Sequence, residues 1–336
     1  MSNSPVSTFT RAATRKLDEP LNILCMPTHE RYESLLSRTG HNFYAYHAEG
    51  IKTWNETYSP VPDNYHLLDG RLGFNQIPLN IDFDIILSQN KFGQFQTAYP
   101  IARSLHVPMI SLEHTLPMPE WTPDMMEDLR GMRGDVNVFI SEYSTDAWKW
   151  GDLSNTMVVH HGVDSSKFSP DDNVERNDEI LSVVNDWINR DWCCGFGIWR
   201  NVSQGLPVKV VGDTPGLSEP AGLDELSEIY RSSKIFLNTS TISPVPTALL
   251  EAMSSGCAVV STATCMIPEI IQNGINGFIS NDEDELKQYL VDLLNDPNLC
   301  EKIGSEARKT IVERFSEESF LSKWDDIFLA TSRIFA

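Results

Sequence analysis

The chain has 336 residues, more than one hydrophobic core ordinarily organises, so its length predicts two domains. Apolar residues make up 41% of the sequence, which excludes a largely disordered chain. The 47 acidic residues against 26 basic ones give a net charge of -21, which disfavours a protein that grips nucleic acid over a broad surface.

The first 20 residues are polar and rich in Ser and Thr. They lack the apolar stretch of a secretory signal, and no later apolar run approaches the roughly 20 residues of a membrane span. We therefore expect a flexible tail over 1–20, no transmembrane segment and a cytoplasmic protein. The six cysteines contain no C-x-x-C pair, which favours reduced, buried thiols, although the adjacent Cys193 and Cys194 leave a redox pair open.

The sequence alternates apolar strand patterns with helical patterns, and it does so twice. This rhythm is typical of βαβ units, and the strand at 83–90 is apolar on both faces, as strands of a buried parallel sheet are. The polar segment 163–178 separates the two halves and is interpreted as a linker. The first half has expected strands at 21–28, 42–47, 83–90, 107–114, 136–141 and 156–162, with helices at 30–37, 92–105 and 142–150.

The second half repeats the alternation up to the C-terminus. Two doubly wound α/β domains facing each other would leave a cleft at the carboxyl ends of their strands, and that cleft is the expected site. The expected strands are 179–186, 206–213, 234–240, 257–262 and 276–280, and the helices are 223–233, 245–255, 267–272 and those after Glu283.

The stretch 243–262, SPVPTALLEAMSSGCAVVST, holds the most specific chemical signal. A helix N-terminus has free N–H groups and partial positive charge, so it binds phosphate. Pro246 in the first turn costs no hydrogen bond, and Thr247 and Ala248 are small enough to admit a phosphate. Glu251, one turn further on, suits the two hydroxyls of a ribose. A partly buried Glu that caps or pairs locally fits the periodicity equally well.

Residues 238–279 resemble the donor-binding signature of GT-B glycosyltransferases, in particular the large retaining group often called family four. That signature has an acid, a second acid eight positions later, Ala-Met and a Gly before a strand, and then Gly-Gly-x-Pro-Glu and an Asn-Gly turn. The matching residues are Glu251, Ala252, Met253, Gly256, Pro268, Glu269, Asn273, Gly274, Asn276 and Gly277.

The resemblance implies an α/β protein of the GT-B fold, with two Rossmann-like, doubly wound domains. The two domains are an acceptor-side domain over 21–165 and a donor-binding domain over 166–320. A C-terminal helix over 321–336 is expected to pack back toward the acceptor-side domain. It implies a hexosyl- or pentosyltransferase that uses a nucleotide-diphosphate sugar, with a UDP-sugar as the expected donor and retention of configuration. No cofactor and no metal are expected, because Arg and helix dipoles would carry the diphosphate charge.

The resemblance also implies roles on the donor side. Glu251 takes the ribose, the helix start at Pro246, Thr247 and Ala248 meets the diphosphate, and the strand 206–213 ends in the donor-side Gly212 and Asp213. Arg190 would neutralise the departing diphosphate as a catalytic residue.

Four departures from the family pattern affect these expectations. No Lys accompanies Arg190 at the usual spacing, where Cys194 or its neighbour stands, so Arg200 or Lys209 is left as a substitute. Ser243 replaces the first acid, which contacts the donor sugar in the family. Cys265-Met266 replaces Gly-Gly, and these residues reach positive φ less cheaply. The fourth departure is the absence of a glycine-rich loop from the first domain, where the acceptor-side or phosphate loop would consist of Thr28, His29, Glu30 and Arg31, or would be a polar surface loop.

His114 ends the strand 107–114, at a position where family members often carry a His near the transferred sugar. We expect it to hydrogen-bond a sugar hydroxyl or hold the acceptor; a His that merely caps the strand is the alternative. Glu113 beside it should point to the opposite face, because side chains alternate along a strand.

Two other functions stay open at this stage. A non-catalytic GT-B-like protein that binds a nucleotide sugar would explain the lost acid, Gly-Gly and Lys. The compact size also resembles viral glycosyltransferases, some of which modify hydroxymethylpyrimidine bases in DNA, and a basic segment around Arg31, Arg38, Lys52 and Arg71 could then form a channel in a protein of the host cytoplasm. The acceptor is a glycan, a small molecule or modified nucleic acid, and the oligomeric state is open.

Overall fold

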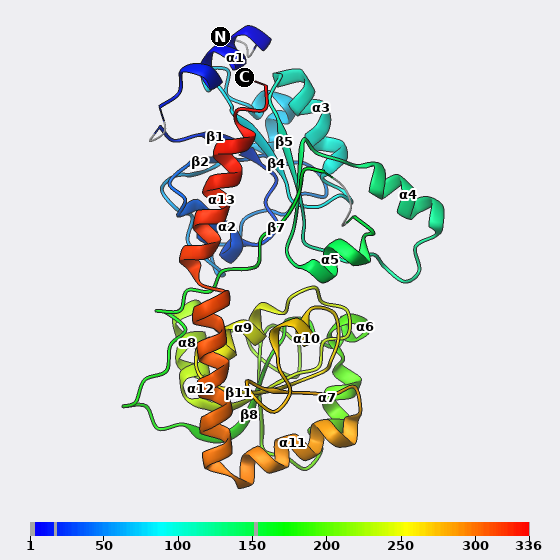
Figure 1. Cartoon of the computed structure of the whole chain (residues 1–336), viewed down its shortest axis with the longest axis vertical. Helices are drawn as coiled ribbons and strands as arrows, with labels where there is room; N and C mark the ends of the chain where they lie inside the picture. Colours follow the sequence, from blue (N-terminus) through cyan, green and yellow to red (C-terminus); the bar gives the residue numbers. More distant parts are fainter. Residues whose placement is uncertain (1–3, 17–18, 151–153, 336) are drawn as a thin grey trace. The chain divides into compact units, whose positions relative to one another are not determined.

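The computed structural model describes residues 4–16, 19–150 and 154–335. The chain divides into two compact units, unit 1 (Met1–His160 with Phe320–Ala336) and unit 2 (His161–Ser319), shown in Figure 1. The sequence places its domain boundaries at 165/166 and 320/321. Each unit is an α/β structure built on a parallel sheet, as the alternating strand and helix patterns predict.

The sheet of unit 1 has the strand order β3-β2-β1-β4-β5-β6-β7, and all neighbouring strands are parallel. The order reverses at β1, because the chain adds β2 and β3 on one side of it and then crosses to add β4 on the other. Strand β4 is buried at every position, which explains its unbroken apolar run. The strands are β1 (Asn22–Cys25), β2 (Asn42–Ala45), β3 (Tyr65–Leu67), β4 (Ile85–Ser88), β5 (Met109–Glu113), β6 (Val136–Phe139) and β7 (Thr156–Val158).

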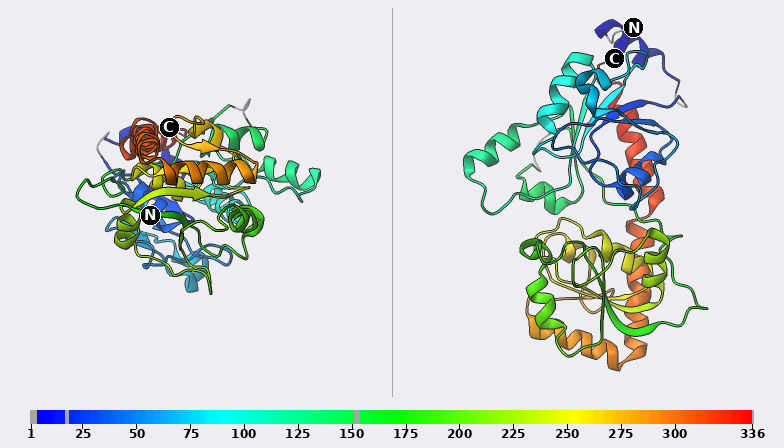
Figure 2. Two further views of the ribbon diagram at one scale, coloured as in Figure 1. Left: turned by 90° about the horizontal axis from the view of Figure 1, so that it is seen from below. Right: turned by 180° about the vertical axis from the view of Figure 1, so that it is seen from behind.

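The helices of unit 1 include the C-terminal helix α13, which belongs to this unit from Phe320 onward. Its Trp324 Nε1 donates to the Tyr32 hydroxyl at 3.2 Å, and Asp325 lies 3.0 Å from His41 Nε2. Helix α4 extends away from the sheet (Figures 1 and 2). The helices are α1 (Pro5–Thr14), α2 (Glu30–Ser37), the 3-10 helix η1 (Gly70–Gln76), α3 (Phe95–Leu105), α4 (Pro123–Gly131), α5 (Glu142–Ala147) and α13 (Glu317–Thr331).

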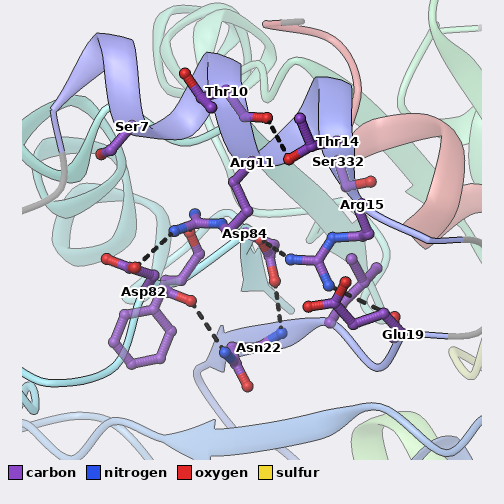
Figure 3. Close-up of polar contacts among 12 residues, drawn as sticks. Ser7, Thr10, Arg11, Thr14, Arg15, Glu19, Asn22, Asp82, Asp84 and Ser332 are labelled. Atoms are coloured by element: carbon purple, nitrogen blue, oxygen red, sulfur yellow. Dashed lines mark hydrogen bonds and ion pairs between the residues drawn. The ribbon is translucent and has the colours of Figure 1, made fainter.

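The expected flexible tail over 1–20 contains an anchored helix instead, as Figure 3 shows. Helix α1 begins at a Ser4 capping box with Pro5 in the first turn. Arg11 Nε lies 2.8 Å and Arg15 Nη2 2.5 Å from the Asp84 carboxylate, which also accepts from the backbone of Asn22 at 2.8 Å. The sequence reasoning failed here because the polar composition hides a carboxylate partner that lies 69 residues beyond Arg15 in the chain.

The sheet of unit 2 has the order β12-β11-β10-β8-β9, again parallel throughout. The strands are β8 (Asn177–Val183), β9 (Val208–Val211), β10 (Ser233–Asn238), β11 (Ala258–Ser261) and β12 (Phe278–Ile279). The helices are α6 (Asp191–Cys194), α7 (Phe196–Val202), α8 (Leu223–Arg231), α9 (Thr247–Ser254), α10 (Ile267–Ile270), α11 (Glu283–Asn295) and α12 (Pro297–Arg314).

The core of unit 2 joins Trp187 and Trp199 to apolar residues of β8, β10 and β11 and of α11 and α12. This core fixes the carboxyl ends of the strands, where the candidate residues of this unit lie.

The strands expected from the sequence are all present, with ends that differ by a few residues. The sequence analysis did not single out α1, β3, η1, α4, α6 or α7. These elements are short or polar, and they lack the periodic apolar run on which the expectations rested. Within the described ranges, no helix has both the length and the apolar character needed to cross a bilayer.

Candidate functional site

The candidate donor site of unit 2 lies where the strand order changes direction, between β8 and β10. In doubly wound sheets ligands bind outside the carboxyl ends of the strands at this point, because the two flanking loops diverge there. The loop 184–190 follows β8, and the loop 239–246, here called the donor loop, follows β10.

The donor loop is held by the backbone of α6. Thr239 Oγ1 donates to the Gly195 carbonyl at 2.9 Å, and the amides of Thr241 and Ile242 donate to the Cys193 carbonyl at 2.9 and 3.2 Å. Gly195 has φ +63°, and a Cβ there would lie 2.0 Å from the Thr239 carbonyl oxygen. Only glycine allows this approach, so the donor loop packs directly on the turn between α6 and α7.

Gly212 and Asp213 adjoin the loop that carries Arg190. The Asp213 amide donates to Asn185 Oδ1 at 2.9 Å, and Arg190 Nη1 donates to the Asn185 carbonyl at 3.3 Å. Gly212 has φ +131°, and a Cβ there would lie 2.1 Å from the carbonyl oxygen of Val184. The structure thus brings Arg190, Gly212 and Asp213 together. Arg190 is exposed.

Helix α9 presents its N-terminus at the end of the donor loop. Pro246 is the N-cap and makes no side-chain capping bond, so the amides of Thr247 and Ala248 begin the helix without one. Thr247 is exposed, while Leu249 and Leu250 are buried. The first turn therefore faces solvent on one side and packs on the core with the other.

The opposite end of α9 meets two guanidinium groups. Arg176 Nη2 donates to the Ser255 carbonyl at 2.6 Å, and Arg308 Nη1 donates to the Ser254 carbonyl at 2.6 Å. Gly256, at φ +76°, turns the chain out of the helix. Positive charge at a helix C-terminus interacts favourably with the helix dipole, so these arginines compensate the partial negative charge at the C-terminus of α9.

Glu251 lies one turn after Thr247 on α9 and is 7% exposed. Positions four residues apart share a helix face, so its carboxylate is on the same side of α9 as Thr247 in the first turn. The burial is compatible both with a ribose ligand and with local pairing.

The departures from the family pattern have local structural consequences. Ser243 is half-buried in the donor loop. Cys265 adopts φ +51° although it is not a glycine, so the loop keeps a left-handed conformation at a cost of about 1 kcal/mol. Cys194 is buried, and its carbonyl accepts from Trp187 Nε1 at 2.8 Å. Lys209 lies inside β9 rather than at its carboxyl end, and Arg200 is in the last turn of α7.

The six cysteines carry free thiols, and five of them are buried, with Cys265 half-buried. The sulfurs of Cys193 and Cys194 lie 3.6 Å apart and form no disulfide.

In unit 1, the residues Thr28, His29, Glu30 and Arg31 lie between β1 and the first turn of α2, beside the point where the strand order reverses. His29 is exposed and is the N-cap of α2 without a side-chain capping bond. Glu30 is buried instead, and it accepts from Lys52 Nζ at 2.7 Å and from the Asn55 amide at 2.9 Å. Glu30 therefore holds the neighbouring loop in place.

His114 follows β5 and is half-buried. Its ring makes an edge-to-face contact with the Tyr32 ring, with centroids 4.7 Å apart. Its Nε2 lies 3.1 Å from Gln89 Oε1, and Gln89 in turn contacts the Glu33 carboxylate. The sequence analysis missed Glu33 and Gln89. A signal existed for Gln89, because it directly follows the buried strand β4, next to β1 in the sheet.

Glu113 and His114 have separate partners, as strand alternation predicts. The Glu113 carboxylate accepts from the Lys91 amide at 2.8 Å and from Thr115 Oγ1 at 2.6 Å. Burial raises the pKa of Glu113, and burial lowers the pKa of Lys91 to about 8. Glu113 thereby fixes the turn that carries His114.

The basic segment considered for nucleic acid is partly neutralised. Lys52 pairs with Glu30 at 2.7 Å, and Arg71 pairs with Asp69 at 2.7 Å. These two cations are less available to a phosphate backbone than the sequence suggests.

Comparison with known proteins agrees with this geometry. Residues 220–310 match the family model described as Glycosyl transferases group 1. The N-acetyl-alpha-D-glucosaminyl L-malate synthase of Bacillus anthracis is 30% identical over 107 residues, which are 31% of this chain and 28% of that enzyme. The sulfoquinovosyl transferase of Arabidopsis thaliana is 36% identical over 170 residues, 47% of this chain and 30% of that protein. The matched part thus spans less than a third of these curated relatives.

Solved structures match over more of the chain. The Anabaena protein HepE in complex with UDP has a TM-score of 0.73 at 14% identity, covering 92% of this chain and 99% of that one. The sucrose-phosphate synthase of Thermosynechococcus elongatus has a TM-score of 0.72 at 11% identity, covering 92% and 98%. At these identities the likeness shows the fold. The chain therefore has the GT-B fold, and its residues 220–310 match the group 1 glycosyltransferase model.

Proposed function

We propose that this chain is a glycosyltransferase that transfers a sugar from a UDP-sugar to an acceptor with retention of configuration. The observation that carries the proposal is the donor loop joined to the N-terminus of α9 at the strand-order reversal of unit 2, inside the segment that matches the group 1 family model. The match to a HepE structure in complex with UDP-glucose supports the choice of donor.

The donor roles follow from charge and position. The first-turn amides at Thr247 and Ala248, after Pro246, bind the diphosphate, and Glu251 accepts hydrogen bonds from the ribose hydroxyls. Arg190, held next to Gly212 and Asp213, neutralises the charge that develops on the departing UDP. Ser243 hydrogen-bonds the sugar where relatives of this type use an acid.

The acceptor-side roles belong to unit 1. His114 hydrogen-bonds a hydroxyl of the sugar or the acceptor, and Thr28, His29 and Arg31 line the same edge of the sheet. A DNA base is the less favoured acceptor, because the net charge is -21 and Lys52 is ion-paired.

The test of donor binding is a thermal-shift panel of UDP-, GDP- and ADP-sugars on the full chain. A ligand at about 100 times its Kd stabilises the folded state by about 2.7 kcal/mol, so a UDP-sugar should raise the Tm measurably. Glu251→Ala should weaken UDP binding by about tenfold to a hundredfold, because a charged hydrogen-bond acceptor contributes about 1.5–3 kcal/mol. The matched control is Glu228→Ala, an exposed Glu on α8.

If no nucleotide sugar raised the Tm at millimolar concentration, the proposal would be contradicted. Equal UDP affinity in Glu251→Ala and Glu228→Ala would refute the ribose assignment. The Ser at 243 favours a second candidate, a non-catalytic nucleotide-sugar-binding protein. Binding of UDP-glucose without any release of UDP, across an acceptor panel, would support that second candidate.

A further inference from the structure

A buried chain of hydrogen bonds in unit 1 connects Glu33 of α2 to His114 at the end of β5. Gln89 Nε2 lies 2.5 Å from Glu33 Oε1, and Gln89 Oε1 lies 3.1 Å from His114 Nε2 and 3.2 Å from Thr28 Oγ1. Glu33 and Gln89 are both completely buried. These hydrogen bonds link Thr28, which follows β1, to Gln89, which follows the neighbouring strand β4, at the point where the strand order of the sheet reverses.

The donor and acceptor capacities of these groups fix the orientation of the chain. The Glu33 carboxylate accepts three hydrogen bonds, from the Thr28 amide at 3.1 Å, from Gln89 Nε2 and from the Tyr65 hydroxyl at 3.0 Å. An ionised carboxylate has no proton to donate, so the nitrogen of the Gln89 amide must face it. The amide oxygen then faces His114, and an oxygen can only accept. The proton on the neutral His114 ring therefore sits on Nε2.

We propose that Glu33 and Gln89 are positioning residues that hold His114 in its Nε2–H tautomer, so that Nδ1 is the accepting nitrogen of the ring. The role of that nitrogen toward a sugar hydroxyl rests on the proposed function, whereas the tautomer itself does not. A fixed tautomer matters because in the other tautomer Nδ1 carries the proton and donates instead of accepting. The ring would then bind a hydroxyl through its oxygen lone pair rather than through its proton.

The environment of Glu33 makes this arrangement sensitive to pH near neutrality. Burial raises the pKa of Glu33 to about 7, the negative charge of Glu30 adds to the rise, and the hydrogen bonds from Thr28, Gln89 and Tyr65 oppose it. The other groups that face Glu33 are the Cys25 thiol, which burial keeps protonated by raising its pKa, and the Tyr32 hydroxyl, whose pKa burial also raises. Glu30 itself pairs with Lys52.

Protonation of Glu33 reverses the direction of the hydrogen bonds from Glu33 through Gln89 to His114. The neutral carboxyl can donate its proton to the Gln89 oxygen once the amide rotates by 180°, and the amide nitrogen then faces His114. His114 Nε2 must accept, so the ring loses its Nε2 proton to solvent and takes one at Nδ1. One proton is gained at Glu33, and the protonation count of the ring is unchanged.

The experiment reads the His114 tautomer by nitrogen NMR on the full chain labelled with ¹⁵N-histidine, with His114→Gln used to assign the signal. The native protein should show the Nε2–H tautomer at pH 8.5 and a growing Nδ1–H fraction as the pH falls toward 6.5. Glu33→Gln should abolish that pH dependence, and Gln89→Leu should abolish it too. Glu30→Gln is the matched control, since this buried carboxylate of the same helix turn bonds Lys52 and Asn55 rather than Gln89. The tautomer change should persist in this variant, with its midpoint moved to lower pH, because the charge of Glu30 raises the pKa of Glu33.

A functional readout separates positioning from mere folding. With UDP-glucose as the probe, Glu33→Gln should slow the enzymatic formation of UDP from UDP-glucose by about tenfold or more. The Kd for UDP should stay within about twofold, because the donor residues belong to unit 2. A native His114 in the Nδ1–H form at pH 8.5, or a tautomer change that persists in both Glu33→Gln and Gln89→Leu, would overturn the proposal. Failure of the proposed function would appear separately, as absence of any nucleotide-sugar binding with the tautomer result unaffected.

Discussion

The contact between Gly195 and Thr239 offers a quantitative test of the candidate donor site. A Cβ at Gly195 would lie 2.0 Å from the Thr239 carbonyl oxygen, whereas a carbon and an oxygen ordinarily approach to about 3.3 Å. The substitution Gly195→Ala therefore forces the two segments apart by roughly 1 Å. That movement breaks the hydrogen bond that the single Thr239 hydroxyl proton shares between the carbonyls of Gly195 and Cys194, at 2.9 and 3.2 Å.

The expected cost has two parts. A left-handed backbone with a Cβ costs about 1 kcal/mol, and loss of the hydrogen bond of the Thr239 hydroxyl costs about 1 kcal/mol, so the free energy of unfolding should fall by about 2 kcal/mol. Gly205→Ala is the matched control in the same unit. Gly205 has φ +81°, and a Cβ added there would have no neighbouring atom within 4 Å, so this substitution should cost only about 1 kcal/mol of backbone strain.

The assay is urea unfolding of both full-length variants by circular dichroism, together with calorimetric titration of UDP. Because Thr239 begins the donor loop, Gly195→Ala should also weaken UDP binding by about tenfold or more, equivalent to about 1.4 kcal/mol, while Gly205→Ala leaves it unchanged. Equal urea midpoints and equal UDP affinities for the two variants would refute the reasoning, since both would then show only the strain of the left-handed backbone.

Two further predictions concern single side chains. Asp84→Asn should destabilise unit 1 by about 3 kcal/mol and expose α1 to hydrogen exchange, because it leaves Arg11 and Arg15 without their buried carboxylate. The control Asp82→Asn, at a side chain 46% exposed and 3.4 Å from Arg11, should cost less than about 1 kcal/mol, and equal exchange rates in the two variants would contradict the anchoring role. At Cys265, with φ +51°, the Gly variant should be more stable than the Ala variant by about 1 kcal/mol in thermal unfolding. The opposite order, which is normal where φ is negative, would show that the loop is not left-handed in solution.

The sequence predicted the elements whose signals are local. The strand pattern of 83–90 and the helix at 30–37 needed only the spacing of apolar residues and their flanking Gly, Pro and Asn residues. The donor-binding stretch was recognisable for the same reason, since Glu251, Gly256 and Pro268 to Glu269 lie within one short segment. Their roles toward a ligand remain predictions, because burial alone does not distinguish a ribose ligand from a local pair.

The remaining features depend on which distant segments meet, and no local pattern encodes that. Gln89 joins Glu33 to His114 only because β4 crosses to the far side of β1, next to β5. Gly195 is required only because Thr239 packs against it, and α1 is ordered only because Asp84 lies beneath it. The sequence by itself determined most strands and the longer helices through their local periodicity, and the donor signature through its resemblance to a known family. The tertiary structure alone decided the contacts between residues tens of positions apart, because strand order sets which side chains share an edge of the sheet.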